Sequence, residues 1–238
     1  MSWRNLLCLM AFVLLLGLAT GPAIATDYYI DPVNGDDDTG DGSLGNPWES
    51  FKNIIYYYSS GDRPPGWVSL QPGETIYLMN GTHNTYIYPG GGYASAVASF
   101  RGYDGSSGSP FRIKAYPGHS PVIDGSGTNP GIRIWQSDYW EVDGLVVKNC
   151  YGRGVLYAEG TGFKMSNTHI YDTDGVDNNN VAGLELGATD TEVYDCIFND
   201  NYDRVCEDTG GVGNHNSCLL YTSPSPRDLS TSRMPSSA

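Results

Sequence analysis

Three segments decide the fold: GIRIWQSDYWEVDGLVVKN (Gly131–Asn149), GVLYAEGTGFKMSNTHIYD (Gly154–Asp172) and GLELGATDTEVYDCIFND (Gly183–Asp200). Each begins with glycine and a short apolar strand, continues into a second strand, and ends on Asn or Asp. Val142, Met165 and Val193 occupy corresponding positions, 23 and 28 residues apart. Strand-containing units that repeat at this interval are typical of the coils of a solenoid.

Coils of a solenoid bury their inward side chains against those of the coils on either side. We therefore expect two interior columns, the first formed by Val142, Met165 and Val193 and the second by Val147, Ile170 and Phe198. The sequence predicts an all-β fold, a right-handed parallel β-helix solenoid. An antiparallel sandwich would explain the alternation within strands but not the repeated order, and the leucine spacing of leucine-rich repeats is absent.

The N-terminal part is expected to close one end of the stack. Trp48, Phe51, Ile55 and Tyr58 recur at helical spacing after Pro47, which predicts a short amphipathic capping helix over 48–59. Such a cap would cover an apolar core and an unpaired strand edge. Short strands are predicted at Tyr28–Pro32, Thr75–Met79, Phe111–Ala115 and Pro121–Gly125.

The order of these elements carries a family resemblance. The loop and helix, the stretch PGETIYL (Pro72–Leu78), the turn at Asn80-Gly81 and the stretch FRIKAYPGHSPVIDG (Phe111–Gly125) follow one another. Over Tyr28–Ser217 the chain resembles the pectate-lyase-like superfamily, and within it the polysaccharide lyases that act on uronic acid polymers. The resemblance also leaves open glycoside hydrolases, epimerases, phage tailspikes and non-catalytic surface proteins.

The two ends of the chain have a different character. Residues 1–25 combine Arg4, an apolar run and Ala23-Ile24-Ala25, which predicts a secretory signal peptide and a secreted, extracellular protein. Residues 26–217 are expected to form a partial β-helix domain. Residues 218–238, CLLYTSPSPRDLSTSRMPSSA, resemble a translated sequencing adapter, so we expect this tail to be disordered and the native fold to continue beyond Ser217.

Charge and cysteine content narrow the classes of partner. The formal net charge is −14, which disfavours nucleic acid and anionic membrane surfaces as partners. The mature part carries Cys150, Cys196 and Cys206 and has no CxxC pair, so zinc has no support. Cys196 and Cys206 are the nearest pair for a disulfide in an exported protein. The oligomeric state is not indicated.

A lyase that acts on acidic polysaccharide must neutralise a uronate carboxylate and remove the neighbouring proton, using Ca²⁺ or Arg for the first task and Lys or Arg for the second. The stretch from Cys196 to Asp208, rich in Asp and Asn, is similar to a segment of calcium-dependent lyases. This resemblance implies Ca²⁺ as a cofactor, with Asp203 and Asp208 as its ligands. The alternative interpretation is that these residues form turns and cap strand ends.

Other polar and aromatic residues are weaker candidates. Two more acidic groups lie in loops, one with Asp36, Asp37, Asp38 and Asp41 and the other with Asp172, Asp174 and Asp177. Both groups are interpreted as loops. Candidate bases are Arg133, Lys148, Lys164, Arg204, His169 and His215, and none is assigned as catalytic. Trp135, Tyr139 and Trp140 can stack on sugars, although Trp140 also fits a core position.

These observations favour a secreted β-helix protein that acts on extracellular acidic polysaccharide as a fragment of a calcium-assisted polysaccharide lyase. The alternative is a non-catalytic domain that binds carbohydrate or builds a cell surface. A glycoside hydrolase is a third hypothesis, and it requires two carboxylates that face one groove.

Overall fold

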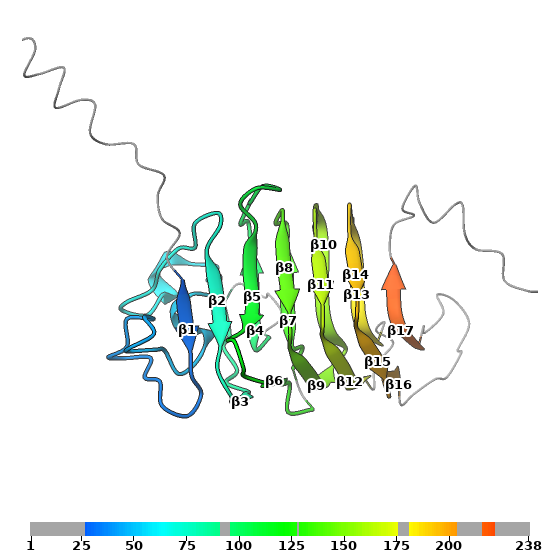
Figure 1. Cartoon of the computed structure of the whole chain (residues 1–238), viewed down its shortest axis with the longest axis horizontal. Helices are drawn as coiled ribbons and strands as arrows, with labels where there is room; N and C mark the ends of the chain where they lie inside the picture. Colours follow the sequence, from blue (N-terminus) through cyan, green and yellow to red (C-terminus); the bar gives the residue numbers. More distant parts are fainter. Residues whose placement is uncertain (1–26, 91–95, 128, 176–180, 204–215, 222–238) are drawn as a thin grey trace, which may run out of the picture.

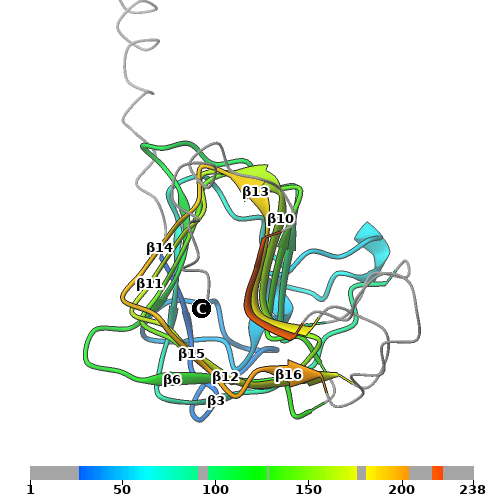
Figure 2. The ribbon, with the colours of Figure 1, turned by 90° about the vertical axis from the view of Figure 1, so that its right-hand side faces the viewer.

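The computed structural model describes residues 27–90, 96–127, 129–175, 181–203 and 216–221. Its strands lie side by side along one axis (Figure 1) and form three sheets. Viewed down that axis, the sheets surround a common interior (Figure 2). All strand pairs in the sheets are parallel. The predicted parallel β-helix is therefore confirmed.

The first sheet contains, in spatial order, β1 (Tyr28–Ile30), β2 (Thr75–Leu78), β5 (Phe111–Ala115), β8 (Trp140–Asp143), β11 (Lys164–Ser166) and β14 (Glu192–Tyr194). The second contains β4 (Ala98–Arg101), β7 (Ile132–Trp135), β10 (Arg153–Thr161), β13 (Val181–Thr189) and β17 (Asn216–Tyr221). The third contains β3 (Gly81–His83), β6 (Pro121–Asp124), β9 (Val146–Tyr151), β12 (His169–Gly175) and β15 (Ile197–Asn199), and β16 (Tyr202–Asp203) also pairs with β12.

Both predicted interior columns are present. Met165 of β11 is in register with Val142 of β8 and with Val193 of β14. In the third sheet the second column forms in the same way, because β12 pairs Ile170 with Val147 on one side and with Phe198 on the other. The spacing of the sequence repeat therefore corresponds to one turn of the solenoid.

The polar and glycine positions of the repeat form the corners between sheets. Asn149, Asp172 and Asp200, which end the three repeats, have φ values of 51°, 52° and 53°. Asn and Asp tolerate this left-handed region better than other side chains, because their short polar groups bond locally. At the start of a repeat, Gly154 packs so closely that an added Cβ would lie 2.6 Å from the backbone oxygen of Gly183.

The predicted capping helix over 48–59 is wrong. Within the described residues the secondary structure contains no α-helix, and this region has only two single turns of 3-10 helix, η1 (Phe51–Asn53) and η2 (Ser60–Asp62). The run from Ile54 to Tyr58 is β-branched and aromatic, and such residues are weak helix formers. The backbone also bonds outside the segment, since Tyr56 N donates to Ser99 O at 2.9 Å and Tyr58 N to Pro89 O at 2.7 Å.

The segment nevertheless covers the N-terminal end of the core. Trp48, Phe51 and Ile55 are at most 1% exposed, whereas Tyr58 is 59% exposed. Phe51 packs edge-on against Phe100 of β4, with ring centroids 6.3 Å apart. The apolar spacing in the sequence therefore reflects the burial of these side chains at the end of the stack and not a helix.

Several predictions about the ends of the chain concern residues outside the described ranges. Residues 1–25 lie wholly outside them, so the signal peptide stays a prediction. Strand β17 includes residues 218–221, the first four of the tail for which we expect disorder, and the rest of that tail is not described. Over the described residues, no helix is long and apolar enough to cross a membrane.

Candidate functional site

The outer faces of the first and third sheets carry cations that pair with carboxylates on neighbouring coils. Lys164 Nζ lies 3.4 Å from Glu192 Oε2, and Lys148 Nζ lies 3.6 Å from Asp124 Oδ2. Two more pairs of this kind are Arg112–Glu141 and Lys114–Asp143. Lys164, a candidate base, therefore belongs to the charged ladder of the first sheet, and Lys148, another, forms an ion pair on the third sheet.

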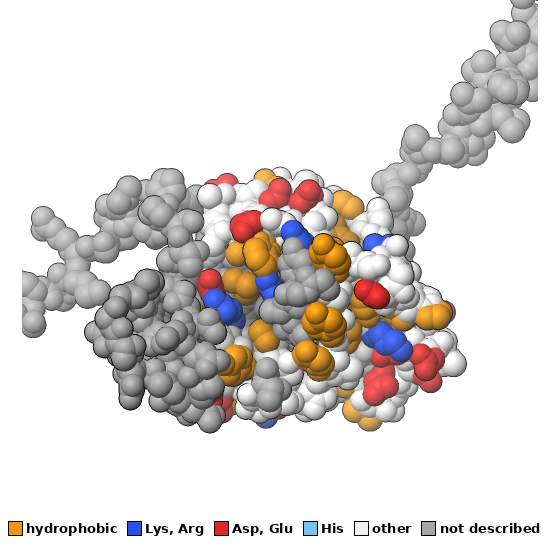
Figure 3. Space-filling model, turned by 180° about the vertical axis from the view of Figure 1, so that it is seen from behind, with side chains coloured by type: hydrophobic (Ala, Val, Ile, Leu, Met, Phe, Trp, Pro, Cys, Tyr) orange, Lys and Arg blue, Asp and Glu red, His pale blue; other side chains and the backbone are white. Residues whose placement is uncertain are grey.

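The second sheet presents a different outer face. Ile132, Ile134, Val155, Tyr157, Leu184 and Leu186 are at most 1% exposed and point inward. The residues that alternate with them point outward, and strand register places Arg133 of β7 beside Leu156 of β10, and Leu156 beside Glu185 of β13. Figure 3, which views the molecule from this side, shows apolar, basic and acidic side chains interspersed on its described surface.

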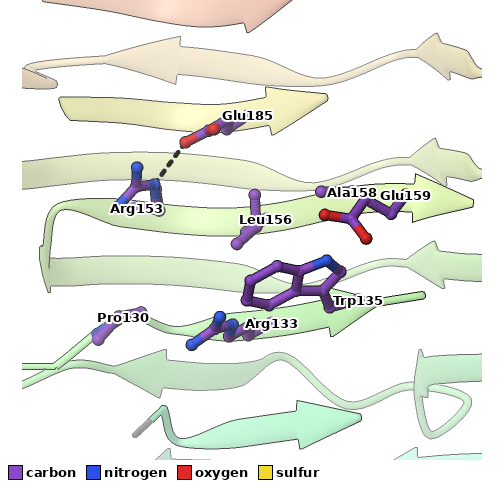
Figure 4. Close-up of a pocket in the computed structure, with 8 residues that line it drawn as sticks. All are labelled: Pro130, Arg133, Trp135, Arg153, Leu156, Ala158, Glu159 and Glu185. Carbon is purple, nitrogen blue, oxygen red and sulfur yellow. Dashed lines mark hydrogen bonds and ion pairs between the residues drawn. The ribbon is translucent and has the colours of Figure 1, made fainter. Parts of the chain in front are cut away.

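A hollow of about 330 Å³ lies on this face, and we call it the arginine hollow. Its lining consists of Pro130, Arg133, Trp135, Arg153, Leu156, Ala158, Glu159 and Glu185 (Figure 4). The small and medium-sized side chains of Leu156 and Ala158 form its floor between longer neighbours. Arg133 is 9% exposed, so its guanidinium is held within the surface rather than extended into solvent.

Two arginines lie beside the Trp135 ring, and a third forms an ion pair at the other end of the hollow. The Arg133 guanidinium carbon lies 4.5 Å from the centre of this ring, and that of Arg101 on β4 lies 5.9 Å from it. Arg153 forms an ion pair with Glu185, drawn as a dashed line in Figure 4. Arg101 Nε donates to Gln136 Oε1 at 2.8 Å, and Gln136 Nε2 donates to Glu159 Oε2 at 2.8 Å.

Arg133 is buried and lies close to two other arginines, and both features change its pKa. Burial lowers the pKa of Arg133, the neighbouring Arg153 and Arg101 lower it further, and Glu185 raises it. A bound anion would relieve this repulsion, because an opposite charge favours the protonated guanidinium.

The chemistry of this hollow suits an anionic ring-shaped ligand. Guanidinium groups bind carboxylates through paired, charge-assisted hydrogen bonds. An indole ring offers a flat apolar surface beside them. The hollow is open on the outside of a sheet, so a long polymer can lie across it without having to enter an enclosed cavity.

Comparisons with known proteins agree with this architecture. The chain is 32% identical over 123 residues to pectate lyase L of Paenibacillus polymyxa, a match that covers 50% of this chain and 24% of that protein. The crystal structure of pectate lyase Pel9A superimposes with a TM-score of 0.54 at 22% identity, over 82% of this chain and 46% of the other. The chain is a pectate-lyase-like parallel β-helix. It spans about a quarter of the length of the curated relative that it matches.

Two further comparisons complete the findings. The structure of an alginate lyase from Paenibacillus sp. matches with a TM-score of 0.41 at 21% identity, over 54% of this chain and 38% of the other. No family model matches the chain.

The predicted metal ligands of this pectate-lyase-like β-helix are only partly within the described ranges. Asp203 ends β16, where its backbone pairs with Gly175 of β12, and its side chain is not described. Asp208 lies outside the described residues. Asn201, in the same stretch, is buried, and its amide accepts from Thr173 N and donates to Ile170 O. Asn201 therefore has a structural role, and Asp203 and Asp208 stay predictions.

The two other acidic groups differ in how much of them can be traced. In the N-terminal loop, Asp36 Oδ1 accepts from the backbone of Asp38 and Thr39, and Asp37 accepts from Ser50. These bonds confirm a self-bonded loop. In the second group, Asp172 forms a corner of the coil and Asp177 is outside the described residues. Among the described residues, no group of three His, Cys, Asp or Glu side chains is placed to hold a metal.

The remaining aromatic and basic candidates lie in different parts of the fold. Trp135 lines the arginine hollow, whereas Trp140 is fully buried in the core. Tyr139 has a φ of 55° at a corner. His169 Nε2 lies 2.5 Å from Asn199 Oδ1 in the next coil. Arg204 and His215 are outside the described residues.

The sequence indicated Arg133 and Trp135 but missed Arg153, Glu159 and Glu185. A signal for part of this set was available, because the third position of the three aligned repeats is Arg133, Leu156 and Glu185. That column alternates with two apolar columns and therefore had to face outward. Arg153 and Glu159 lie outside the aligned strand positions, so no repeat pattern pointed to them.

The cysteines have defined environments where they are described. Cys150 and Cys196 are free thiols. Burial raises the pKa of Cys150 to about 12. Cys206 is outside the described residues, and no chemistry of the site involves Cys150 or Cys196.

Proposed function

We propose that this protein binds an acidic polysaccharide across the arginine hollow and cleaves it as a lyase. The observation that carries the proposal is the grouping of Arg101 and Arg153 about Arg133, whose guanidinium lies beside Trp135, on one outer face of a pectate-lyase-like β-helix. This grouping is notable because the chain as a whole has a formal net charge of −14. Its similarity in sequence to pectate lyase L supports the same class of substrate.

The residues of the hollow would divide the work of elimination. Arg133 and Arg153 would hold the carboxylate of a uronate unit and offset the negative charge that builds up when the neighbouring carbon loses its proton. Trp135 would support the sugar ring. The base that accepts this proton is not assigned to the hollow. Burial and the adjacent arginines lower the pKa of Arg133, but the uronate carboxylate that it holds would favour its protonated form.

Calcium belongs to the proposal as a cofactor of the whole protein. Asp203 and Asp208 would supply carboxylate oxygens to it, which are the ligands that Ca²⁺ prefers, and the bound ion would help to neutralise the substrate carboxylate. The described part of this region fits only partly, because Asn201 is already engaged with the backbone. The roles assigned to the arginines do not depend on the ion.

Secretion is proposed with the function. The signal peptide predicted over residues 1–25 would export the chain to where acidic polysaccharides occur. The acidic net charge fits a soluble extracellular protein.

Two alternatives use the same hollow. A non-catalytic domain would bind the polysaccharide through Arg133 and Trp135 without cleaving it. A glycoside hydrolase would use Glu159 and Glu185, which both line the hollow. Their present partners favour a structural role, because Glu185 pairs with Arg153 and Glu159 accepts from Gln136.

The test is to incubate the protein with polygalacturonate and with alginate and to follow the ultraviolet absorbance of unsaturated products, with and without a chelator. We expect absorbance to rise with one of these polymers and the Arg133→Gln variant to lose the activity. The matched control is Lys164→Gln. Lys164 pairs with Glu192 on the first sheet, whereas the arginine hollow lies on the second sheet. Binding without products would select the carbohydrate-binding alternative, and new reducing ends without any unsaturated product would select the hydrolase.

A further inference from the structure

A second hollow lies between the N-terminal cap segment and the turn that follows β4. We call it the cap hollow. Its volume is about 310 Å³, and its lining includes Tyr56, Arg63, Trp67, Arg101, Tyr103 and Asp104. It therefore joins side chains of the cap to side chains of the first coil in the second sheet.

Its central aromatic side chain is held in a fixed position. Trp67 Nε1 donates to Ile55 O at 2.8 Å, which fixes the plane of the indole. The Arg63 guanidinium carbon lies 3.8 Å from the centre of this ring. Across the described residues, no carboxylate lies within ion-pair distance of Arg63. Its positive charge is thus positioned by stacking, without an ion pair in the described part of the chain.

Arg101 connects the cap hollow with the arginine hollow. It lines the cap hollow, where its guanidinium carbon lies 5.8 Å from the Tyr56 ring centre. On its other side it lies 5.9 Å from the Trp135 ring centre and bonds to Gln136. Neighbouring strands of a sheet are about 4.8 Å apart, and β4 adjoins β7 in the second sheet. The two hollows therefore follow one another along the solenoid axis.

We propose that the cap hollow is a second sugar subsite, which binds a further uronate unit of the same polysaccharide chain that lies across the arginine hollow. Arg63 and Arg101 hold the carboxylate of this unit. Asp104, which also lines the hollow, accepts hydrogen bonds from sugar hydroxyls. This inference rests on the proposed function, because it extends the polymer from one hollow to the next.

The test compares the binding of a short and a long oligouronide to the full chain by titration calorimetry. The wild-type protein should bind the long oligomer more tightly. Arg63→Gln should weaken binding of the long oligomer about fivefold and leave the short one unchanged, because one charge-assisted contact is lost at a partly exposed site. The matched control is Lys52→Gln, an exposed cap lysine that pairs with Asp38 away from the hollow.

The outcomes separate this inference from the proposed function. A methyl-esterified long oligomer should bind no better than the short acidic one, since the gain depends on the carboxylate. If Arg63→Gln leaves the preference for the long oligomer intact while Arg133→Gln weakens both oligomers, the subsite is wrong and the proposed function stands. If neither oligomer binds to the wild-type protein, both proposals are overturned.

Discussion

Replacing Gly154 with alanine should destabilise the stack of coils directly. A Cβ at this position would lie 2.5 Å from Ile170 Cγ2, 2.6 Å from Gly183 O and 3.2 Å from Thr173 Oγ1. Favourable contacts between carbons are about 3.5 to 4.0 Å long, so the overlap is close to an ångström. The Gly183 oxygen belongs to the next coil, which cannot withdraw without disturbing the β10–β13 ladder on both sides of it.

Overpacking of this kind costs about 1 to 3 kcal/mol, and more where the backbone cannot yield. We expect about 3 kcal/mol here, because two of the three atoms are less than 3 Å away and one is backbone. For a chain of this size that loss lowers the melting temperature by about 6 to 12 °C. The assay is thermal unfolding followed by circular dichroism, with urea unfolding to obtain the change in free energy.

The control for this substitution is Gly45→Ala. An added Cβ at Gly45 meets nothing within 4 Å, and the residue does not have a positive φ. Its melting temperature should change little, since surface substitutions away from special features stay within about 0.5 kcal/mol. If Gly154→Ala has the same melting temperature as the control and the wild type, successive coils do not approach as closely at this glycine as described.

Three further predictions concern the core and its titrating groups. Met165→Ala, at the centre of the first interior column, should cost about 2 to 5 kcal/mol in urea unfolding; a loss below 1 kcal/mol, estimated as roughly one methylene, would contradict the column. Burial lowers the pKa of His83, whose Nε2 lies 3.0 Å from Met79 O, so the unfolded chain binds the proton first and stability should fall as pH drops below the ordinary value of 6.5. His83→Gln should reduce the dependence of the unfolding free energy on pH between about pH 7 and pH 5. An unchanged dependence would mean that another group causes it. Cys150 should resist thiol reagents in the native protein while the half-buried Cys196 reacts, as read by mass spectrometry of peptides, and equal labelling would refute the burial of Cys150.

The coil architecture was predictable because successive coils of a solenoid repeat the same pattern of residue types. Val142, Met165 and Val193 align by type, and the structure pairs them residue for residue. Asn149 and Asp172 align for a different reason, since a left-handed corner selects Asn, Asp or Gly. Both signals are local to one coil and recur in the next.

The cap and the early coils were less predictable because their structure depends on tertiary partners. The spacing of Trp48, Phe51 and Ile55 suits a helix, but the backbone of Tyr56 bonds to Ser99 of β4 instead. Strand β3 (Gly81–His83) and strand β4 (Ala98–Arg101) were not predicted, because so few residues carry too short a pattern.

The arginine hollow could be predicted only in part. Arg133 and Trp135 were candidates from residue type and strand position. Their convergence with Arg153 and Glu159 depends on which sheet each strand joins and on the register between coils. Residue type alone does not distinguish Arg133 from Lys164, which the fold places in an ion pair on another sheet.

The most direct measurement is a crystal structure of the protein with an oligouronide bound. We expect a uronate carboxylate within about 2.7 to 2.9 Å of the Arg133 and Arg153 guanidinium nitrogens, with a sugar ring against Trp135. An oligouronide bound along the charged ladder of the first sheet, with the arginine hollow left to solvent, would contradict the proposal that this hollow binds the polysaccharide.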